Sequence, residues 1–190
     1  MSETINRELA LWCRGFLKIL PMVLLGSILA LSGCATKPAF ELIPAPLSVD
    51  PTMADPDNSI IWAEFNGDSV HGGGGQECCT LLPEPWQPGS VATIKWQKDP
   101  KPFDPDMPPS GTKAYREAYA KHAANYQNHE VTIPIPYYKD SCAVLLVFLP
   151  CNQVRPVIDC DEKLQYRKMY DRTDAERMKF LGVNPVCPKP

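Results

Sequence analysis

The chain has 190 residues, of which 44% are hydrophobic and 22% charged, with a formal net charge of −3. This length fits one domain of ordinary size, and the hydrophobic fraction is enough for a core. The basic residues form no stripe, which argues against an electrostatic partner such as nucleic acid.

The first segment has the parts of a bacterial export signal. Three basic residues precede an apolar stretch over residues 19–31, which is shorter than the about 20 residues that span a bilayer core. The stretch ends in Leu31-Ser32-Gly33-Cys34. This ending resembles the lipobox of bacterial lipoproteins, in which the cysteine thiol receives a lipid. The resemblance implies a signal peptide over residues 1–33 and a diacyl or triacyl lipid, with palmitate as an acyl chain, on Cys34.

The residue after Cys34 bears on the destination of the protein. Lipoproteins that stay in the inner membrane often carry Asp there, whereas this chain has Ala35. By that resemblance we expect the outer membrane, with the domain facing the periplasm. Without residues 1–33, 16 basic and 20 acidic residues remain, so anchoring has to come from the lipid. An ordinary cleaved signal, or a short anchor with a chance cysteine, is the alternative.

The next segment, residues 34–58, is rich in proline. Such composition is typical of an extended, semi-rigid linker, and predicts a tether that lifts the domain from the membrane. A proline motif for a partner is the alternative. We expect a single globular domain over residues 59–190.

Short strands alternate with loops through most of this domain. Residues 91–96 alternate between small or apolar and polar side chains, which is typical of a strand with one buried face. Residues 143–149 are continuously apolar, as in a fully buried strand. Together with these two, the sequence predicts strands over residues 60–66, 78–82, 131–135 and 154–159.

Two segments have helical patterns. Thr112 can cap a helix over residues 112–127, on which Tyr115, Tyr119, His122 and Tyr126 fall on one stripe. Near the C-terminus, Thr173 and Glu176 match a capping box, and Gly182 is a plausible helix stop. The predicted fold is therefore mainly β (α+β): a disulfide-stiffened sandwich with an inserted helix and a helical C-terminal segment.

Six cysteines remain after the signal and Cys34 are set aside, and an even number in an exported chain predicts disulfides. If residues 143–149 and 154–159 form a hairpin, Cys142 and Cys160 meet at its open end. Neighbouring cysteines on a regular strand point to opposite faces, so we expect Cys78 and Cys79 to bridge to different partners. Zinc is the alternative, but no CxxC pair occurs. The disulfide candidates are Cys78, Cys79, Cys142, Cys151, Cys160 and Cys187.

No motif for catalysis is complete. His71-Gly72-Gly73-Gly74-Gly75 is similar to the oxyanion loop of some lipases, but the chain lacks the G-x-S-x-G nucleophile elbow. A flexible loop is the simpler interpretation. The acidic stretches 104–106 and 159–162 do not fit a calcium loop. We therefore expect no enzyme activity, no catalytic residue, no metal and no cofactor.

A resemblance over about thirty residues suggests a role. The stretch from Asn66 to Trp96 combines the glycine run, the Cys78-Cys79 pair, Leu82-Pro83 and Trp86-x-Pro88-Gly89. It resembles a family of short proteobacterial lipoproteins of unknown biochemistry. Its members are often encoded beside type VI secretion phospholipase effectors, and some are immunity proteins against them. The resemblance implies a periplasmic protein that binds and inhibits a secreted lipase, and it carries over no catalytic residues.

We expect such a partner to contact loops of the domain: residues 71–75, residues 99–111 and the pair Tyr137-Tyr138. An envelope lipoprotein with a structural or small-ligand-binding role is the alternative, and a hydrolase is the third. The predicted partner-binding residues are His71, Gly73, Phe103, Tyr137 and Tyr138.

Overall fold

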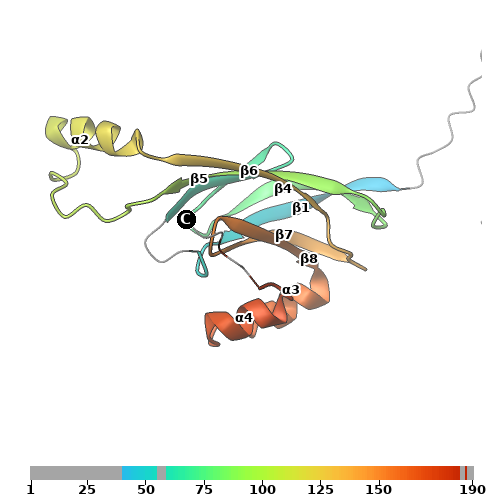
Figure 1. Cartoon of the computed structure of the whole chain (residues 1–190). Coiled ribbons are helices and arrows are strands. Elements are labelled where there is room, and N and C mark those ends of the chain that lie inside the picture. The colour runs from blue at the N-terminus through green and yellow to red at the C-terminus, as the bar shows by residue number, and fades with distance from the viewer. Residues whose placement is uncertain (1–39, 55–58, 185–186, 188–190) are drawn as a thin grey trace, which may run out of the picture. The chain divides into compact units, whose positions relative to one another are not determined.

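The computed structural model describes residues 40–54, 59–184 and 187. They form the predicted mainly β, α+β fold, in which two four-stranded sheets pack as a sandwich accompanied by three short helices (Figure 1). The predicted signal peptide and Cys34 lie outside these residues. None of the helices in the described part of the chain is long and apolar enough to cross a membrane.

The first sheet has the strand order β4-β1-β7-β8, and the second has the order β3-β2-β5-β6. Paired neighbours are antiparallel, except that β1 and β7 run parallel. The strands of the first sheet are β1 (Glu41–Asp50), β4 (Gln76–Glu84), β7 (Ser141–Leu149) and β8 (Gln153–Asp159). Those of the second sheet are β2 (Ser59–Phe65), β3 (Asp68–His71), β5 (Val91–Asp99) and β6 (Gln127–Pro134).

The main core lies between the two sheets. On β5 the alternating residues Ala92, Ile94 and Trp96 are buried, as the sequence pattern predicts. They meet inward residues of the other sheet, including Leu47 and Val144. Burial of each large apolar side chain contributes about 1.5–3 kcal/mol relative to exposure. This core therefore holds the two sheets together.

β7 is buried on both faces, which explains its continuous apolar sequence. Leu146 and Phe148 belong to the core between the sheets. Leu145 and Val147 belong to a second cluster on the outer side of the sheet. That cluster is covered by two C-terminal helices, α3 (Cys160–Arg167) and α4 (Asp174–Phe180). The predicted hairpin of β7 and β8 is confirmed.

The predicted proline-rich tether is wrong for residues 41–50, because these form β1 in the middle of a sheet. Pro44 and Pro46 lie where β1 pairs only with β4, and pairing with β7 begins at Leu47. Proline has no N–H to donate, so a strand accepts it where one side is unpaired. The folded domain therefore begins well before the predicted start at Ser59.

Two of the disulfides tie the first sheet to the C-terminal part of the chain. Cys142 is bonded to Cys160, as predicted from the hairpin. Cys151 is bonded to Cys187. The first bridge fixes the start of α3 beside the start of β7, and the second links the β7–β8 turn to the residue near the C-terminus.

The expectation that Cys78 and Cys79 reach different partners is wrong, because they are bonded to each other. The prediction assumed regular alternation along the strand. At this point β4 is irregular: Ala45 pairs with Thr80 and Leu47 pairs with Glu77. The two cysteines thus lie opposite the single residue Pro46, in a β-bulge where side chains do not simply alternate.

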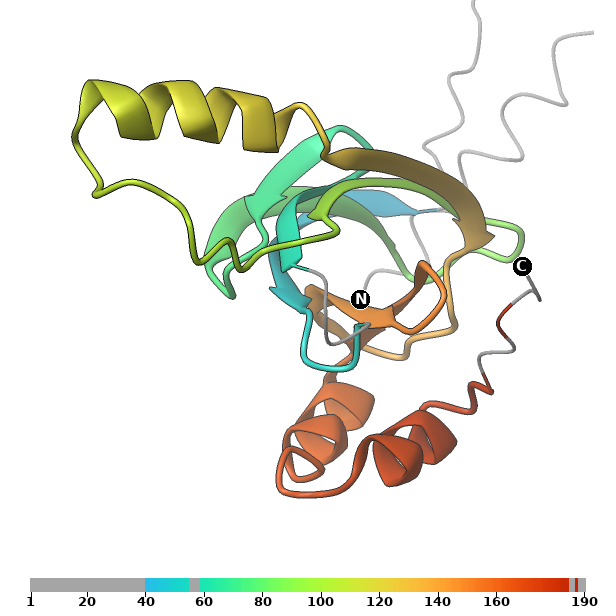
Figure 2. The same ribbon diagram turned by 60° about the vertical axis from the view of Figure 1, so that its left-hand side comes forward.

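The inserted helix α2 (Lys113–Ala123) projects from one end of the sandwich (Figure 1). Its N-cap is Thr112, as predicted, and the Thr112 Oγ1 accepts a hydrogen bond from the backbone N–H of Tyr115 at 3.0 Å. The helix ends a turn earlier than predicted, and β6 begins at Gln127. In Figures 1 and 2, α2 lies on one side of the sheets and α3 and α4 lie on the other.

Candidate functional site

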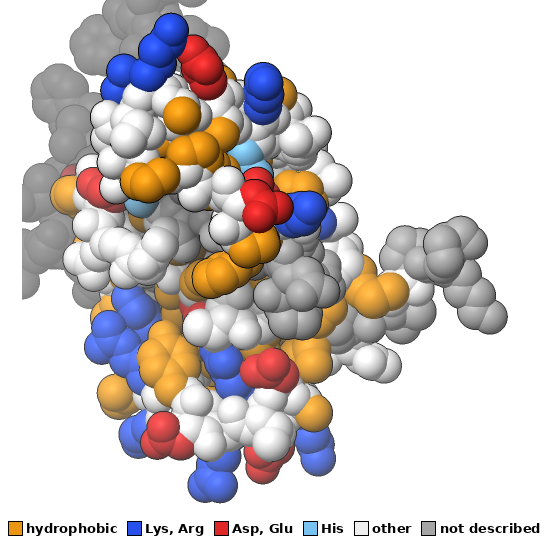
Figure 3. Space-filling view, turned by 90° about the vertical axis from the view of Figure 1, so that its left-hand side faces the viewer, with side chains coloured by type: hydrophobic (Ala, Val, Ile, Leu, Met, Phe, Trp, Pro, Cys, Tyr) orange, Lys and Arg blue, Asp and Glu red, His pale blue; other side chains and the backbone are white. Residues whose placement is uncertain are grey.

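Three connections gather at one end of the sandwich, which we call the arm end. β1, β3, β5 and β7 all finish there: β1 and β7 run parallel to each other, and the other strands that pair with these four run in the opposite direction. The connections are the glycine turn at residues 72–75, the segment 100–126 between β5 and β6, and the turn at residues 150–152. Figure 3 looks onto this end and shows hydrophobic side chains on the upper part and again over the lower part, among charges of both signs.

We call residues 100–126 the arm. It consists of a proline- and aspartate-rich loop followed by α2, and no residue of α2 is buried. Phe103 in the loop is 88% exposed, and Tyr119 on the helix is also exposed. An exposed helix with aromatic side chains gains little from its own domain, because most helical stability in proteins comes from packing. The arm is therefore a surface available to another molecule.

A polar contact between one partly buried side chain of α2 and one buried side chain of β5 fastens the arm to the sheet. The His122 Nε2 lies 2.7 Å from the Asp99 Oδ2, and both side chains are largely buried. The other carboxylate oxygen of Asp99 accepts a hydrogen bond from the backbone N–H of Lys101 at 2.9 Å. Asp99 is the last residue of β5, so it holds both the start of the arm and its helix. We call the pair His122 and Asp99 the latch.

Tyrosines line the helix next to the latch. The rings of Tyr115 and Tyr119 stack with centroids 5.9 Å apart, and the Tyr126 hydroxyl donates to the Tyr119 hydroxyl at 3.4 Å. The ring of Tyr126 meets His122 edge-on. Burial, followed by the hydrogen bond to Tyr119, raises the pKa of the Tyr126 hydroxyl. The stripe predicted from sequence is thus a continuous aromatic row, and it leads outward from the latch.

The glycine turn lies at the same end. A Cβ at Gly72 would come within 1.8 Å of the Ile60 carbonyl oxygen, whereas a Cβ at Gly73 would meet nothing within 4 Å. Gly74 has a φ of +90°, which favours glycine. The run is therefore required by the backbone at Gly72 and Gly74. His71 and Gly73, both predicted to contact a partner, are exposed here.

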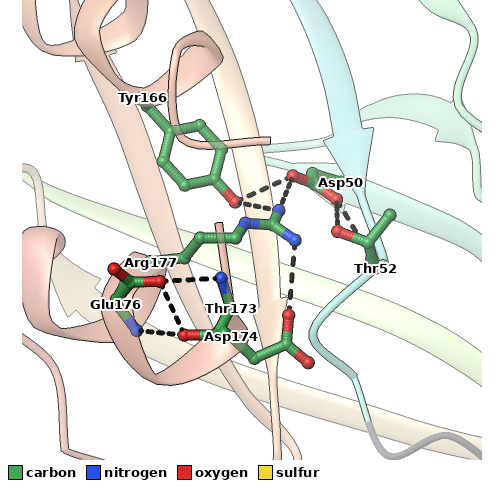
Figure 4. A network of polar contacts seen from close by, with 7 residues as sticks. All are labelled: Asp50, Thr52, Tyr166, Thr173, Asp174, Glu176 and Arg177. Atoms are coloured by element: carbon green, nitrogen blue, oxygen red, sulfur yellow. Dashed lines mark hydrogen bonds and ion pairs between the residues drawn. The ribbon is translucent and has the colours of Figure 1, made fainter. Parts of the chain in front are cut away.

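A hollow of about 460 Å³ lies beside this turn. Asp50, Thr52 and Arg177 in its lining belong to a polar network (Figure 4): the Asp50 Oδ2 accepts hydrogen bonds from the Tyr166 hydroxyl and the Arg177 Nη2, each at 2.8 Å. The Asp50 Oδ1 accepts one from the Thr52 hydroxyl at 2.6 Å. Burial, then the charge of Asp50, raises the pKa of Tyr166. The hollow is lined by Val49, Asp50, Pro51, Thr52, Gly73, Gly74, Tyr170 and Arg177.

The network joins β1 to the C-terminal helices, and it has a structural role. Asp50 and Arg177 are only 5% and 4% exposed. No local sequence pattern predicts this network, because Tyr166 and Arg177 are 116 and 127 residues from Asp50 along the chain. Taken alone, the sequence around each of these three residues indicates no buried polar contact.

The pair Tyr137-Tyr138 lies at the opposite end of the sandwich, in the connection between β6 and β7. Tyr137 is exposed and packs edge-on against Trp86. The prediction that Tyr138 contacts a partner is wrong, because Tyr138 is 1% exposed and its hydroxyl donates to the Pro83 carbonyl. Burial raises the pKa of Tyr138 to about 12. The predicted partner-binding residues are thus divided: His71, Gly73 and Phe103 share the arm end, whereas Tyr137 does not.

The three histidines lie apart, so they share no site. His71 is at the glycine turn, His122 is in the latch, and the ring of His129 stacks on Trp96. Burial lowers the pKa of His129. Among residues 40–54, 59–184 and 187, no three His, Cys, Asp or Glu side chains are arranged to hold a metal ion.

The acidic stretch 159–162 has structural partners. Asp159 is the N-cap of α3, and its Oδ1 accepts hydrogen bonds from the backbone N–H groups of Asp161 and Glu162. Glu162 forms an ion pair with Arg155, with the Arg155 Nη2 at 2.6 Å from the Glu162 Oε1. These carboxylates are used within the domain.

Together these features define a disulfide-stiffened β-sandwich domain with a projecting aromatic arm. A family model described as "Protein of unknown function (DUF3304)" matches residues 55–156, and the chain belongs to this family. The match includes the glycine turn, the Cys78-Cys79 bridge and the whole arm. No curated protein and no solved structure matches the chain.

Proposed function

We propose that the protein is a lipid-anchored periplasmic binding protein, an immunity protein that inhibits a type VI secreted phospholipase. The observation that carries this proposal is the arm: a helix without a buried residue, preceded by a loop with Phe103 88% exposed. Its described neighbours at the arm end include His71 and Gly73 of the glycine turn. The resemblance over residues 66–96 supports the choice of partner.

The composition of the arm suits a protein interface. Large aromatic side chains act as anchors in binding sites, because they bury much area with few rotatable bonds. Phe103, Tyr115 and Tyr119 are such side chains, and the latch fixes the direction of their helix. A stable interface buries about 800 Å² on each partner. The arm and the glycine turn offer two segments at the same end of the sandwich for such a contact.

The proposed lipid anchor on Cys34 is consistent with a protein that inhibits a phospholipase. Six residue steps separate Cys34 from Phe40, and they span at most about 20 Å. β1 begins at the end of the sandwich opposite the arm end. A lipid on Cys34 therefore keeps one end near the bilayer and leaves the arm directed into the periplasm. A phospholipase must reach that bilayer, so an anchored inhibitor meets it there.

The test is co-expression with a phospholipase effector encoded beside this protein and exported to the periplasm. We expect cells to survive only with this protein present, and a complex to be recovered from membranes. The variant Phe103→Ala with Tyr119→Ala should lose protection and complex. Tyr137→Ala, an exposed aromatic at the opposite end, is the matched control and should keep both. Cell death despite the intact protein, without a complex, would overturn the proposal.

A small-ligand-binding role in the envelope is the second candidate. The hollow of about 460 Å³ beside Thr52, Gly73 and Tyr170 favours it. Replacing Tyr170 by Trp would narrow this hollow without touching the arm. Under the second candidate that variant loses function in the envelope, whereas under the immunity proposal it still protects against the effector.

A further inference from the structure

The end of the sandwich opposite the arm carries a group of exposed apolar side chains. Among the described residues, nine large hydrophobic side chains are exposed, and five lie at or near this end. We call these five the apolar rim. They are between 36% and 67% exposed, and they are Phe40, Leu42, Leu81, Val91 and Tyr137.

The pairing of the strands brings these residues together. Leu42 on β1 is opposite Pro83 on β4, and Leu81 is opposite Pro44. Val91 begins β5 and is opposite Pro134, the last residue of β6. Phe40 immediately precedes β1, and Tyr137 follows β6. All five therefore belong to the end where β1, β5 and β7 begin.

The side chains of the apolar rim do not pack into the core. On β5, Ala92 and Ile94 face the core, so Val91 faces outward from the second sheet. On β4, Leu82 faces the core and Leu81 faces outward from the first sheet. The apolar side chains thus lie on the outer faces of both sheets at one end. Side chains placed in this way can contact a flat apolar medium that lies against this end of the domain.

From this arrangement we propose that the apolar rim docks the domain into the surface of the lipid bilayer. The inference rests on the proposed lipid on Cys34, which lies six residue steps before Phe40 and so within about 20 Å of this member of the rim. A short tether raises the effective concentration of the bilayer at the rim, so a modest apolar contact suffices.

The polar groups at this end agree with a bilayer interface. The Trp86 Nε1 donates to the Ile135 carbonyl oxygen at 3.2 Å, and the Trp86 ring packs against Tyr137. Tryptophan and tyrosine are enriched at the headgroup level of membranes, because their rings are amphipathic. Trp86 and Tyr137 would occupy that level, with the aliphatic rim residues beside them.

Charge does not drive this docking. Glu41, Lys139 and Asp140 are exposed at this end, and Glu84 is half-buried. Three of these four are acidic, so anionic lipid is not attracted. We therefore expect docking on zwitterionic lipid, with little effect of salt, because apolar contact is not screened by ions.

The experiment uses the full protein, purified with its lipid and reconstituted into phosphatidylcholine vesicles. Lipids brominated at a shallow depth should quench Trp86 emission more than lipids brominated near the bilayer centre. Trp62 and Trp96 lie within the second sheet and should not be quenched. The variant Trp86→Phe should abolish the quenched component.

Matched variants separate docking from folding. Phe40→Ser, Leu42→Ser and Val91→Ser combined should remove the quenching, although the Trp86 and Tyr137 contact is kept. Phe103→Ser with Tyr119→Ser, at the arm end, should leave the quenching unchanged. Thermal unfolding of each variant checks that the domain remains folded.

The outcomes distinguish a failure of the proposed docking from a failure of the proposed lipid anchor. A lipidated, vesicle-bound protein without quenching overturns the docking, and leaves the lipid anchor intact. Crosslinked dimers through Lys139 in place of quenching identify a second copy as the occupant of the rim, and also overturn it. A mass spectrum that shows no lipid on Cys34 overturns the anchor, and the docking inference with it.

Discussion

The His122 Nε2 lies 2.7 Å from the Asp99 Oδ2, and this contact joins the projecting helix α2 to the last residue of β5. The two residues are 23 positions apart, and the arm is the chain between and just beyond them. Although no residue of α2 is fully buried, the His122 side chain is only 13% exposed where it meets Asp99, so the latch holds the helix to the sheet. The orientation of the aromatic row thus depends on one pair of side chains.

Removal of the latch should loosen the arm without unfolding the domain. In Asp99→Ala, His122 loses its partner and Lys101 loses its acceptor, so the amides of α2 should exchange with solvent faster. Amide hydrogen exchange measures this, while the strands of the core keep their protection. Glu117→Ala, which removes the exposed ion pair with Lys113, is the control and should change little. Equal exchange in both variants would contradict the role of the latch.

The buried network should be essential for stability. Arg177→Met leaves the buried carboxylate of Asp50 without its cation, which costs about 3–5 kcal/mol of unfolding free energy. This is a large part of the 5–15 kcal/mol typical of a domain. Urea denaturation measures the change. Asp174→Asn affects only the exposed partner of Arg177 and should cost less than about 0.5 kcal/mol; a similar loss in both variants would contradict this account.

The disulfides should differ in what they contribute. The Cys142–Cys160 bridge closes a loop with a sequence separation of 18, so its loss should destabilise the domain by about 3 kcal/mol. The Cys78–Cys79 bridge joins adjacent residues and closes no such loop. Thermal unfolding of the variant with Cys78→Ser and Cys79→Ser should therefore show a smaller shift than the variant with Cys142→Ser and Cys160→Ser. The reverse order would contradict the prediction.

The glycine turn offers a matched pair of variants. Gly72→Ala places a Cβ against the Ile60 carbonyl oxygen and should destabilise the domain by roughly 1–3 kcal/mol, as overpacking does. Gly73→Ala has open space and should change stability by less than about 0.5 kcal/mol. Chemical denaturation compares the two. If Gly73→Ala nevertheless lost the partner, the turn would be part of the interface.

Acid should weaken the cap of α3. The backbone N–H of Lys139, together with those at the start of α3, lowers the pKa of Asp159. A carboxylate with a lowered pKa in the folded state adds stability above its ordinary pKa of about 4, and this is lost as pH falls through the folded value. Asp159→Asn should therefore be less stable than the natural protein at pH 7, and the gap should close as the pH falls below about 4 and through the lowered pKa of the folded state. A gap independent of pH would show that the charge of Asp159 does not matter.

Local sequence patterns predicted much of the fold correctly. The alternation of residues 91–96, the apolar run 143–149 and the Thr112 cap each act within a short window, so they indicate β5, β7 and α2. The capping box of Thr173 and Glu176 is also present. The hairpin geometry then placed Cys142 beside Cys160.

The errors arose where distant segments determine the structure. The prolines of residues 44–46 indicate an extended chain, but only the pairing with β4 makes it a strand. Tyr137 and Tyr138 look alike in sequence, and the core decides that Tyr138 is buried. The latch and the buried network join residues that no local pattern relates. The candidate site therefore depends on tertiary contacts, apart from its aromatic stripe.

The position of β1 has a mechanical consequence. The segment that would carry the lipid continues directly into a strand that is paired with β4 and then with β7. A pull on the proposed membrane anchor would load these hydrogen bonds in shear, along the length of the strand, and many bonds would share the force. A protease cut before β1 would release the domain whole, whereas a cut within β1 would remove a central strand. Under the proposed lipidation, anchorage and folding would thus depend on the same ten residues.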